Sequence, residues 1–502
     1  MKYVYWRRAR QIVQILSLLA FFALVVYTFR DVQRPVNAQG LMRLDPLAAL
    51  VTSLSTRRWI AAFIPALLLT MATLILGRFW CGWLCPLGTI LDVVPAPSEG
   101  AGDARSGWRG VKYGLLFLIL FAAFWRNTTL LILDPLAIFV RSVTALVIPG
   151  LNWLIVQLEG TLYKAGILRG VVDAVDAALQ GTIISYRQPY YQGVLPLSLL
   201  LGGILALNLF KKRVWCRYLC PLGGLLSLLS RASWLKRRAA PSCVECSACE
   251  KVCPMGTIDG DEMYASDSGE CILCMDCAAD CPQGAIRFEG DVSIAWDKGY
   301  EPTRRQLLTA LGASVGGLAL LRVTPSTHHP DPRRLRPPGV KEEELLATCI
   351  RCGACMRACP SHGLQPSWTE SGIEGLWTPI LVPRLGHCDY SCTACGDTCP
   401  TGAIPSLSLE EKRETPIGKA YIDPELCIAW SGRSPCIVCE EMCPLPGKAI
   451  ILEEKEVQDD RGGTRTLQVP VVQHERCIGC GTCENKCPVN GEAAIRVIVD
   501  PL

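Results

Sequence analysis

The chain has 502 residues, of which half are hydrophobic and 28 are cysteine, and its formal net charge at pH 7 is only +4. This length suggests several domains, and the small net charge gives no argument for nucleic-acid binding. No cysteine precedes Cys81, and all of them lie in short clusters followed by proline, whereas disulfide frameworks use scattered cysteines. The composition therefore favours metal ligation over a secreted, disulfide-bonded scaffold.

The first 230 residues are apolar and predict an α-helical membrane bundle. We expect four spans, at residues 11–29, 59–77, 111–125 and 194–210. Segment 136–158 is also apolar, but it contains Arg141 and Pro149, so we expect it at the interface or packed against the bundle. A fifth span there would reverse the later topology.

Basic residues orient the bundle as a multi-pass protein of the cytoplasmic membrane. They precede the first span, follow the fourth and lie between the second and third. These segments are therefore expected on the cytoplasmic side, and loops 30–58 and 126–193 outside.

The bundle contains an internal repeat, because RFWCGWLCPLG at 78–88 matches RVWCRYLCPLG at 213–223. Each copy closes the second helix of a pair, which implies two halves related by an axis along the membrane normal. The i, i+4 spacing puts both thiols of a copy on one helical face, so the four cysteines should converge near the inner side. These are Cys81, Cys85, Cys216 and Cys220. They could hold an iron–sulfur cluster or form a redox-active disulfide beside a quinone; a structural role at the helix ends is the alternative.

Residues 231–300 predict a two-cluster ferredoxin domain on the cytoplasmic side. CVECSACEKVCP and CILCMDCAADCP both have bacterial ferredoxin spacing, in which three cysteines hold one cubane and the fourth reaches the neighbouring cluster. One [4Fe–4S] cluster is assigned to Cys243, Cys246, Cys249 and Cys281, and the other to Cys253, Cys271, Cys274 and Cys277. Zinc also binds paired cysteines, but two evenly spaced runs that each end before proline disfavour it.

Residues 301–340 predict an anchor helix followed by a spacer. TRRQLL at 303–308 and the apolar residues after it are typical of a twin-arginine export signal, which carries folded cargo across a membrane. The alternative is an ordinary anchor whose arginines mark the inner side. The proline-rich stretch 324–340 predicts an extended, semi-rigid linker.

Residues 341–502 supply four further motifs and are expected outside the membrane. The first and last have regular spacing, whereas the second has one extra residue in its first gap and the third has a loop there. Motif by motif, the cysteines are Cys349, Cys352, Cys355, Cys359; Cys388, Cys392, Cys395, Cys399; Cys427, Cys436, Cys439, Cys443; and Cys477, Cys480, Cys483, Cys487. In total, six motifs predict six [4Fe–4S] clusters in two α+β ferredoxin-like domains.

No other cofactor has a signature in the sequence. It contains no flavin or nicotinamide fingerprint and no C-x-x-C-H haem site. All five histidines lie beyond the bundle, which excludes a bis-histidine haem within it. A row of clusters without a substrate pocket predicts electron transfer.

These motifs resemble two known families. The helices with their C-x3-C-P motifs and the adjoining ferredoxin resemble the NapH-type membrane quinol dehydrogenase of periplasmic nitrate respiration. Residues 303–502 resemble the NapG/MauM ferredoxin-type proteins, so the chain looks like a fusion of both. The resemblance implies a quinol dehydrogenase or electron-transfer subunit that carries electrons from the membrane quinone pool to an extracytoplasmic reductase or cytochrome. It also allows for further membrane subunits.

The resemblance further implies that the last four motifs pair outer with outer and inner with inner. Cys349, Cys352, Cys355 would then share a cluster with Cys487; Cys477, Cys480, Cys483 with Cys359; Cys388, Cys392, Cys395 with Cys443; and Cys427, Cys436, Cys439 with Cys399.

Two other functions stay open. Electrons could enter from a cytoplasmic reductant with quinone as the acceptor, or the protein could reduce a metalloenzyme only during its maturation. Continuous quinol oxidation would support the favoured function, and stoichiometric reduction would support a role in maturation.

Overall fold

The structure, a computed structural model, describes residues 2–28, 38–96, 107–166, 169–179, 188–260, 263–290, 304–321, 331–368, 370–458 and 463–499. Their packing forms two units. The N-terminal unit comprises Met1–Val25, Val36–Val143 and Val194–Val323, and the C-terminal unit comprises Val26–Pro35, Thr144–Gly193 and Thr324–Leu502. Thr303 of the arginine motif and linker residues 324–330 lie outside the described residues.

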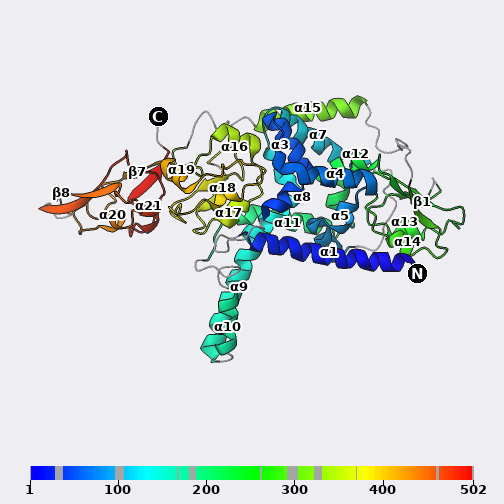
Figure 1. The fold of residues 1–502 in the computed structure, drawn as a ribbon, viewed down its shortest axis with the longest axis horizontal. Coiled ribbons are helices and arrows are strands. Elements are labelled where there is room, and N and C mark those ends of the chain that lie inside the picture. Colours follow the sequence, from blue (N-terminus) through cyan, green and yellow to red (C-terminus); the bar gives the residue numbers. More distant parts are fainter. Residues whose placement is uncertain are drawn as a thin grey trace. The chain divides into compact units, whose positions relative to one another are not determined.

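The N-terminal unit contains a helical bundle (Figure 1). Its helices are α1 Lys2–Val26, α2 Ala38–Arg43, α3 Pro46–Thr56, α4 Ile64–Leu76, α5 Phe79–Trp83, α6 Pro86–Val93, α7 Gly110–Phe124, α8 Pro135–Ser142, α11 Val194–Leu207 and α12 Pro221–Ser230. Helices α4 and α7 each pack against α3 and α12. These four helices therefore form a common core from which the cysteine motifs extend.

Three helical stretches among the described residues are long and apolar enough to cross a membrane: Tyr3–Val26, Gly107–Phe124 and Pro135–Ala165. The first two agree with two of the four expected spans. The other two expected spans are shorter apolar helices, Ala61–Leu76 and Val194–Leu207.

The third long stretch includes residues 136–158, which we expected at the interface or packed against the bundle, and its first part, α8, packs against α6 and α11. Helix α8 continues through a π-helical turn, Val143–Val147, into α9 (Ile148–Ala165). Arg141 does not interrupt this run, because its side chain is buried and its guanidinium donates to a backbone carbonyl oxygen at 2.7 Å. Pro149 follows this π-helical turn directly, and the turn accommodates a residue that has no backbone N–H to donate.

The expected loop 30–58 contains two helices, and a second repeated sequence explains one of them. Leu-Asp-Pro-Leu occurs at 44–47 and again at 133–136, directly before α3 and α8. Asp45 and Asp134 each cap a helix by accepting a backbone N–H at 2.8 Å, with proline as the first helical residue. Both carboxyls are buried and interact electrostatically with each other. The internal repeat therefore includes a helix start as well as the cysteines.

The ferredoxin part of the N-terminal unit consists of short strands and helices. They are β1 Leu235–Ala239, α13 Ala248–Val252, β2 Ile258–Asp259, β3 Ala265–Ser266, α14 Asp276–Ala279 and β4 Ile286–Gly290. Strand β1 pairs antiparallel with β4, and β2 with β3. Helix α15 (Arg304–Leu321) is the helix expected after this domain, and it packs against α7.

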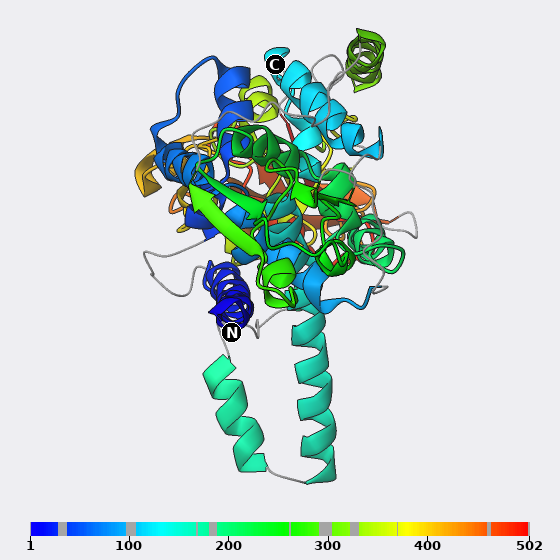
Figure 2. The ribbon, with the colours of Figure 1, turned by 90° about the vertical axis from the view of Figure 1, so that its right-hand side faces the viewer.

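The C-terminal unit has the same α+β character. Its elements are α9, α10 Arg169–Leu179, α16 Glu342–Thr348, α17 Ala354–Ala358, β5 Leu364–Pro366, β6 Pro379–Leu381, α18 Ala394–Asp397, α19 Leu409–Glu414, β7 Lys419–Ile422, α20 Val438–Glu441, β8 Ile450–Gln458, β9 Thr464–Val472, α21 Thr482–Lys486 and β10 Ile495–Ile498. The antiparallel pairs are β5–β6, β7–β10 and β8–β9. Helices α9 and α10 lie side by side (Figure 2).

The second half of the expected linker is packed rather than extended. Leu335 is buried and bridges to Leu381 of β6, and Arg336 forms an ion pair with Glu342 at 2.7 Å. Residues 331–340 are therefore part of the C-terminal unit, because their aliphatic and guanidinium groups have partners within it.

Candidate iron–sulfur sites

Two cavities in the ferredoxin part of the N-terminal unit are each lined by four cysteines. One is lined by Cys243, Cys246, Cys249 and Cys281, and the other by Cys253, Cys271, Cys274 and Cys277. Each motif thus contributes three cysteines to one cavity and its last cysteine to the other. This is the crossed arrangement that the spacing predicts.

The four regular motifs share a backbone conformation around their second cysteine. The residues on both sides of that cysteine have positive φ, as at Glu245 (52°) and Ser247 (57°). The equivalent pairs are Leu273 and Met275, Arg351 and Gly353, and Gly479 and Gly481. A backbone in which residues of positive φ flank the cysteine turns successive N–H groups to one side and makes a concave site for an anion. It therefore fits a cluster that carries the negative charge of four thiolates.

Arg237 on β1 lies between the two cavities. Its side chain is buried, and it interacts electrostatically with Cys277 in one cavity and with Cys249 in the other. The guanidinium compensates thiolate charge in both, so the two sites share one buried cation.

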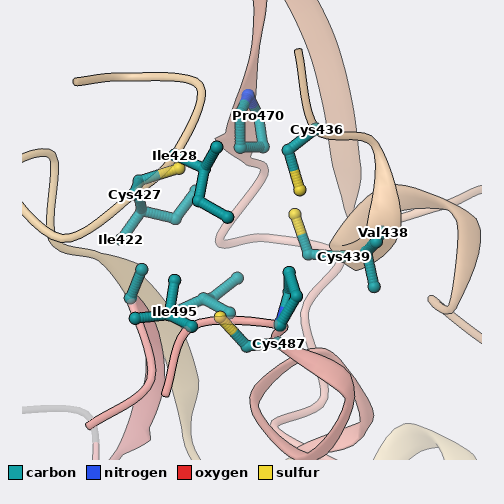
Figure 3. A pocket seen from close by; sticks show the side chains of 12 residues that line it. Ile422, Cys427, Ile428, Cys436, Val438, Cys439, Pro470, Cys487 and Ile495 are labelled. Atoms are coloured by element: carbon teal, nitrogen blue, oxygen red, sulfur yellow. The ribbon is translucent and has the colours of Figure 1, made fainter. Parts of the chain in front are cut away.

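Three cavities in the C-terminal unit are lined in the same way. Their cysteines are Cys349, Cys352, Cys355 and Cys399; Cys359, Cys388, Cys392 and Cys395; and Cys427, Cys436, Cys439 and Cys487. Figure 3 shows the four sulfur-bearing side chains around the last of these cavities. The remaining four, Cys443, Cys477, Cys480 and Cys483, also come together, since Cys480 interacts electrostatically with Cys443, Cys477 and Cys483.

This arrangement corrects the pairing of outer with outer and inner with inner motifs. The first motif of the unit pairs with the second, and the third pairs with the fourth. The reason is local packing: α17, which lies within the first motif, packs on α18 of the second, and α20 packs on α21. Figure 1 shows α17 and α18 in one group and α20 and α21 in another. Each half of the unit therefore resembles a separate two-cluster ferredoxin.

The four sites of the C-terminal unit form a series. Cys355 of the first site interacts electrostatically with Cys395 of the second. Cys388 of the second site interacts with Cys480 of the third, and its backbone N–H donates to the carbonyl oxygen of Cys480 at 2.8 Å. Cys483 of the third site interacts with Cys439 of the fourth. Every neighbouring pair of sites is thus joined through ligand cysteines.

The four bundle cysteines converge, as the repeat predicts. Cys81, Cys85, Cys216 and Cys220 are each less than 9% exposed. Every pair among the four interacts electrostatically. The expected single helical face is wrong, however, because proline follows Cys85 and Cys220, and both cysteines have an extended backbone that ends one helix before the next begins. The thiols converge across this break in each repeat.

The second ferredoxin site lies directly against the bundle cysteines. The indole N–H of Trp83 donates to the carbonyl oxygen of Leu273 at 3.0 Å. Arg217, which lies between Cys216 and Cys220, donates to the carbonyl oxygen of Pro254 at 2.7 Å. Both C-x3-C-P motifs therefore contact loops that carry ligands of the same ferredoxin site.

Glu270, which precedes Cys271, binds several bundle side chains at this contact. Its carboxylate accepts hydrogen bonds from Arg78 at 2.6 Å and from Tyr113 at 2.9 Å, and it pairs with Lys112. Burial alone would raise the pKa of Glu270, but the charges of Lys112 and Arg78 lower it to about 2. The carboxylate is therefore ionised and anchors the ferredoxin to a cationic surface of the bundle.

Family models for iron–sulfur domains match the same segments. A 4Fe-4S binding domain matches residues 58–98 and 193–240, and a second 4Fe-4S binding domain matches residues 470–491. A 4Fe-4S dicluster domain matches residues 242–286 and 348–404. The last range contains the first two motifs of the C-terminal unit, in agreement with their observed pairing.

Curated relatives cover part of the chain. The methylamine utilization ferredoxin-type protein MauM of Methylorubrum extorquens is 40% identical over 211 residues, which are 40% of this chain and 91% of the relative. The chain belongs to the MauM/NapG family of ferredoxin-type proteins. The ferredoxin-type protein NapG of Escherichia coli is 34% identical over 206 residues, 39% of this chain and 85% of NapG.

A further relative covers a different share of this MauM/NapG-family chain. The putative electron transport protein YccM of Escherichia coli is 28% identical over 275 residues, which are 50% of this chain and 65% of YccM. No solved structure matches the chain. Together with the cysteine sites, the matches identify an iron–sulfur electron-transfer protein with multiple [4Fe–4S] clusters.

Several residues at these sites escaped the sequence analysis. Arg78 and Arg213 begin the two copies of the cysteine repeat, and Glu270 directly precedes a ligand motif. The sequence does contain a signal for Arg78 and Arg213, because an arginine occupies the same position in both copies of the repeat. Asp92, which accepts a hydrogen bond from Arg213 at 2.8 Å, and Glu270 had no comparable signal, because their partners lie far away in the sequence.

Proposed function

We propose that this chain carries electrons from membrane quinol to an extracytoplasmic redox partner. The observation that supports this most directly is the grouping of all 28 cysteines into seven sets of four. Three sets form a series in the N-terminal unit and four form a series in the C-terminal unit. The N-terminal part then acts as a NapH-type quinol dehydrogenase fused to the MauM/NapG-type domain.

Six of the sets bind [4Fe–4S] clusters in this proposal, because they come from ferredoxin motifs. Anaerobically purified protein should then contain about 24 irons in these sites, with electron paramagnetic resonance signals of reduced cubanes. An iron content near twelve, or stoichiometric zinc, would overturn the assignment.

The set formed by Cys81, Cys85, Cys216 and Cys220 is a seventh redox centre in this proposal. We favour an iron–sulfur cluster over a disulfide there, because the iron of a cluster balances the negative charge of four thiolates. Such a centre is needed because a hydrocarbon core of about 30 Å lies between the two ferredoxin blocks if they are on opposite sides. Replacing the four cysteines with serine should prevent quinol from reducing the clusters of the C-terminal unit while the other six clusters remain. Unchanged reduction by duroquinol in rapid-freeze experiments would eliminate this centre as a relay.

A second function rests on the exposure of Cys246. This ligand belongs to the ferredoxin site that is farther from the bundle in the N-terminal series, and it is solvent-exposed. An exposed ligand suits exchange with a soluble cytoplasmic reductant. Reduction of quinone by reduced soluble ferredoxin, with no quinol oxidation under turnover, would favour this direction over the first.

A further inference from the structure

The two arginines that begin the cysteine repeats are buried in contact with the four bundle cysteines. Arg78 and Arg213 have no exposed surface in the structure. A buried guanidinium stays protonated and needs an anionic or hydrogen-bonding partner. Each arginine has one carboxylate partner, Glu270 for Arg78 and Asp92 for Arg213.

Arg78 extends from the first repeat to the second. One of its terminal nitrogens, Nη1, lies 2.6 Å from Glu270, while Nη2 lies 4.0 Å from the sulfur of Cys81. A Cβ atom at Gly223 would lie 2.9 Å from the same Nη2. Gly223 ends the second C-x3-C-P-L-G sequence, and its N–H lies 3.2 Å from the sulfur of Cys220. The missing side chain at Gly223 thus leaves room for the guanidinium of the other repeat.

Arg213 extends from the second repeat to the first in the corresponding way. Its Nη1 donates to the carbonyl oxygen of Cys81 at 2.8 Å, and its Nη2 donates to that of Gly88 at 3.2 Å. Gly88 is the equivalent of Gly223 in the first repeat. Arg213 also interacts electrostatically with Cys85 and Cys216. The two arginines therefore cross, so that each repeat supplies a cation to the other.

Cations outnumber carboxylates around the four thiols. Four cations have three carboxylate partners here: Glu270 is shared between Arg78 and Lys112, Asp92 is shared between Arg213 and Arg10, and Arg10 also pairs with Asp276. Four thiolates around an iron–sulfur core leave net negative charge, which increases by one when the core is reduced. In a buried site, fixed positive charge favours the reduced form.

We propose that Arg78 and Arg213 are crossed charge-compensating residues that raise the reduction potential of the four-cysteine centre. The inference rests on the proposed redox role of Cys81, Cys85, Cys216 and Cys220. The cysteines bind the centre, and the arginines act on it from positions that the repeat sequence R-x-W-C fixes in both halves.

The test is a redox titration of the full-length protein. It is monitored by the electron paramagnetic resonance signal that is lost in the Cys81→Ser variant. Arg78→Gln and Arg213→Gln should each lower the ratio of reduced to oxidised centre at least tenfold at a fixed potential, which is 59 mV for one electron. Arg78→Lys and Arg213→Lys keep the charge and should restore most of the ratio. Arg141→Gln removes a buried guanidinium elsewhere in the N-terminal unit and should leave the ratio unchanged.

A second variant tests position rather than charge. Gly223→Ala places a methyl group against Arg78 and should shift the ratio in the same direction as Arg78→Gln, although the arginine is retained. Gly114→Ala is the control, because nothing lies within 4 Å of its added Cβ. An unchanged potential in both glutamine variants, with the signal present, would overturn the inference. Absence of any signal dependent on Cys81 would instead overturn the four-cysteine centre itself.

Discussion

Gly82 lies between the two cysteines of the first bundle motif, where the ferredoxin loop approaches most closely. A Cβ atom there would lie 2.1 Å from the carbonyl oxygen of Ile272. Because the neighbour is backbone, the loop between Cys271 and Cys274 would have to move away. The absence of a side chain at one residue therefore allows the bundle and the second ferredoxin site to touch.

We expect Gly82→Ala to destabilise this contact by about 1–3 kcal/mol, the usual cost of overpacking. The measurement is the midpoint of thermal unfolding of the purified protein, together with the electron paramagnetic resonance signal of the second ferredoxin cluster. Gly114→Ala in α7 should be neutral or stabilising, since it adds no contact and removes a helical glycine. Equal midpoints for the two alanine variants would contradict the close approach.

A buried histidine makes the stability of the C-terminal unit depend on pH. Burial, with the nearby charge of Arg357, lowers the pKa of His362 to about 4. The folded protein therefore binds this proton less readily than the unfolded chain, whose histidine pKa is about 6.5. The contribution of neutral His362 to the free energy of unfolding is complete above pH 6.5 and is lost as the pH falls towards 4.

Lowering the pH from 7.5 to 5 should reduce the free energy of unfolding by roughly 2 kcal/mol through the titration of His362. His362→Gln cannot titrate, so its thermal midpoint should fall less than that of the parent over the same range. Parallel pH profiles for the two proteins would show that His362 is not the responsible group.

At the scale of elements, short helices decide which cysteines share a site. The short helix within each motif packs on the short helix within its partner motif, α17 on α18 and α20 on α21. Sequence spacing identifies the ligands of a motif, but it does not identify the partner motif. That partner depends on which helices bury their apolar sides against each other.

Double variants can distinguish sequential pairing from outer–inner pairing. Cys349→Ala with Cys399→Ala removes two ligands of one site, so iron should fall by about four. Cys349→Ala with Cys487→Ala damages two sites and should remove about eight. The opposite order of losses would restore the outer–inner pairing.

At the scale of the whole molecule, we predict that the two ferredoxin parts lie on opposite sides of the membrane. Basic segments around the bundle favour residues 241–290 inside, and α15 then leads to residues 341–499 outside. Protease added to spheroplasts should digest the C-terminal unit and spare the first ferredoxin. Protection of both parts would contradict this topology.

Export of the C-terminal unit should depend on the paired arginines at the start of α15. Arg304→Lys with Arg305→Lys should abolish protease access if the twin-arginine route is used, although the charge is unchanged. Arg333→Lys with Arg334→Lys, beyond the helix, is the matched control and should be exported. Normal export of both double variants would favour an ordinary anchor.

The sequence by itself determined the chemistry of this protein, because iron–sulfur ligation depends on local cysteine spacing. The three ligands of each ferredoxin motif, the repeat at Cys81 and Cys216, and the helix at 304–321 all follow from residues that are close in the chain. Only the tertiary structure decided what depends on distant residues. It places Cys399 at the site of the first motif. It also shows that the helix continues past Arg141, whose guanidinium is hydrogen-bonded, and that Arg78 and Arg213 each reach the opposite repeat. These contacts arise from the packing of helices, which brings together groups that no local pattern connects.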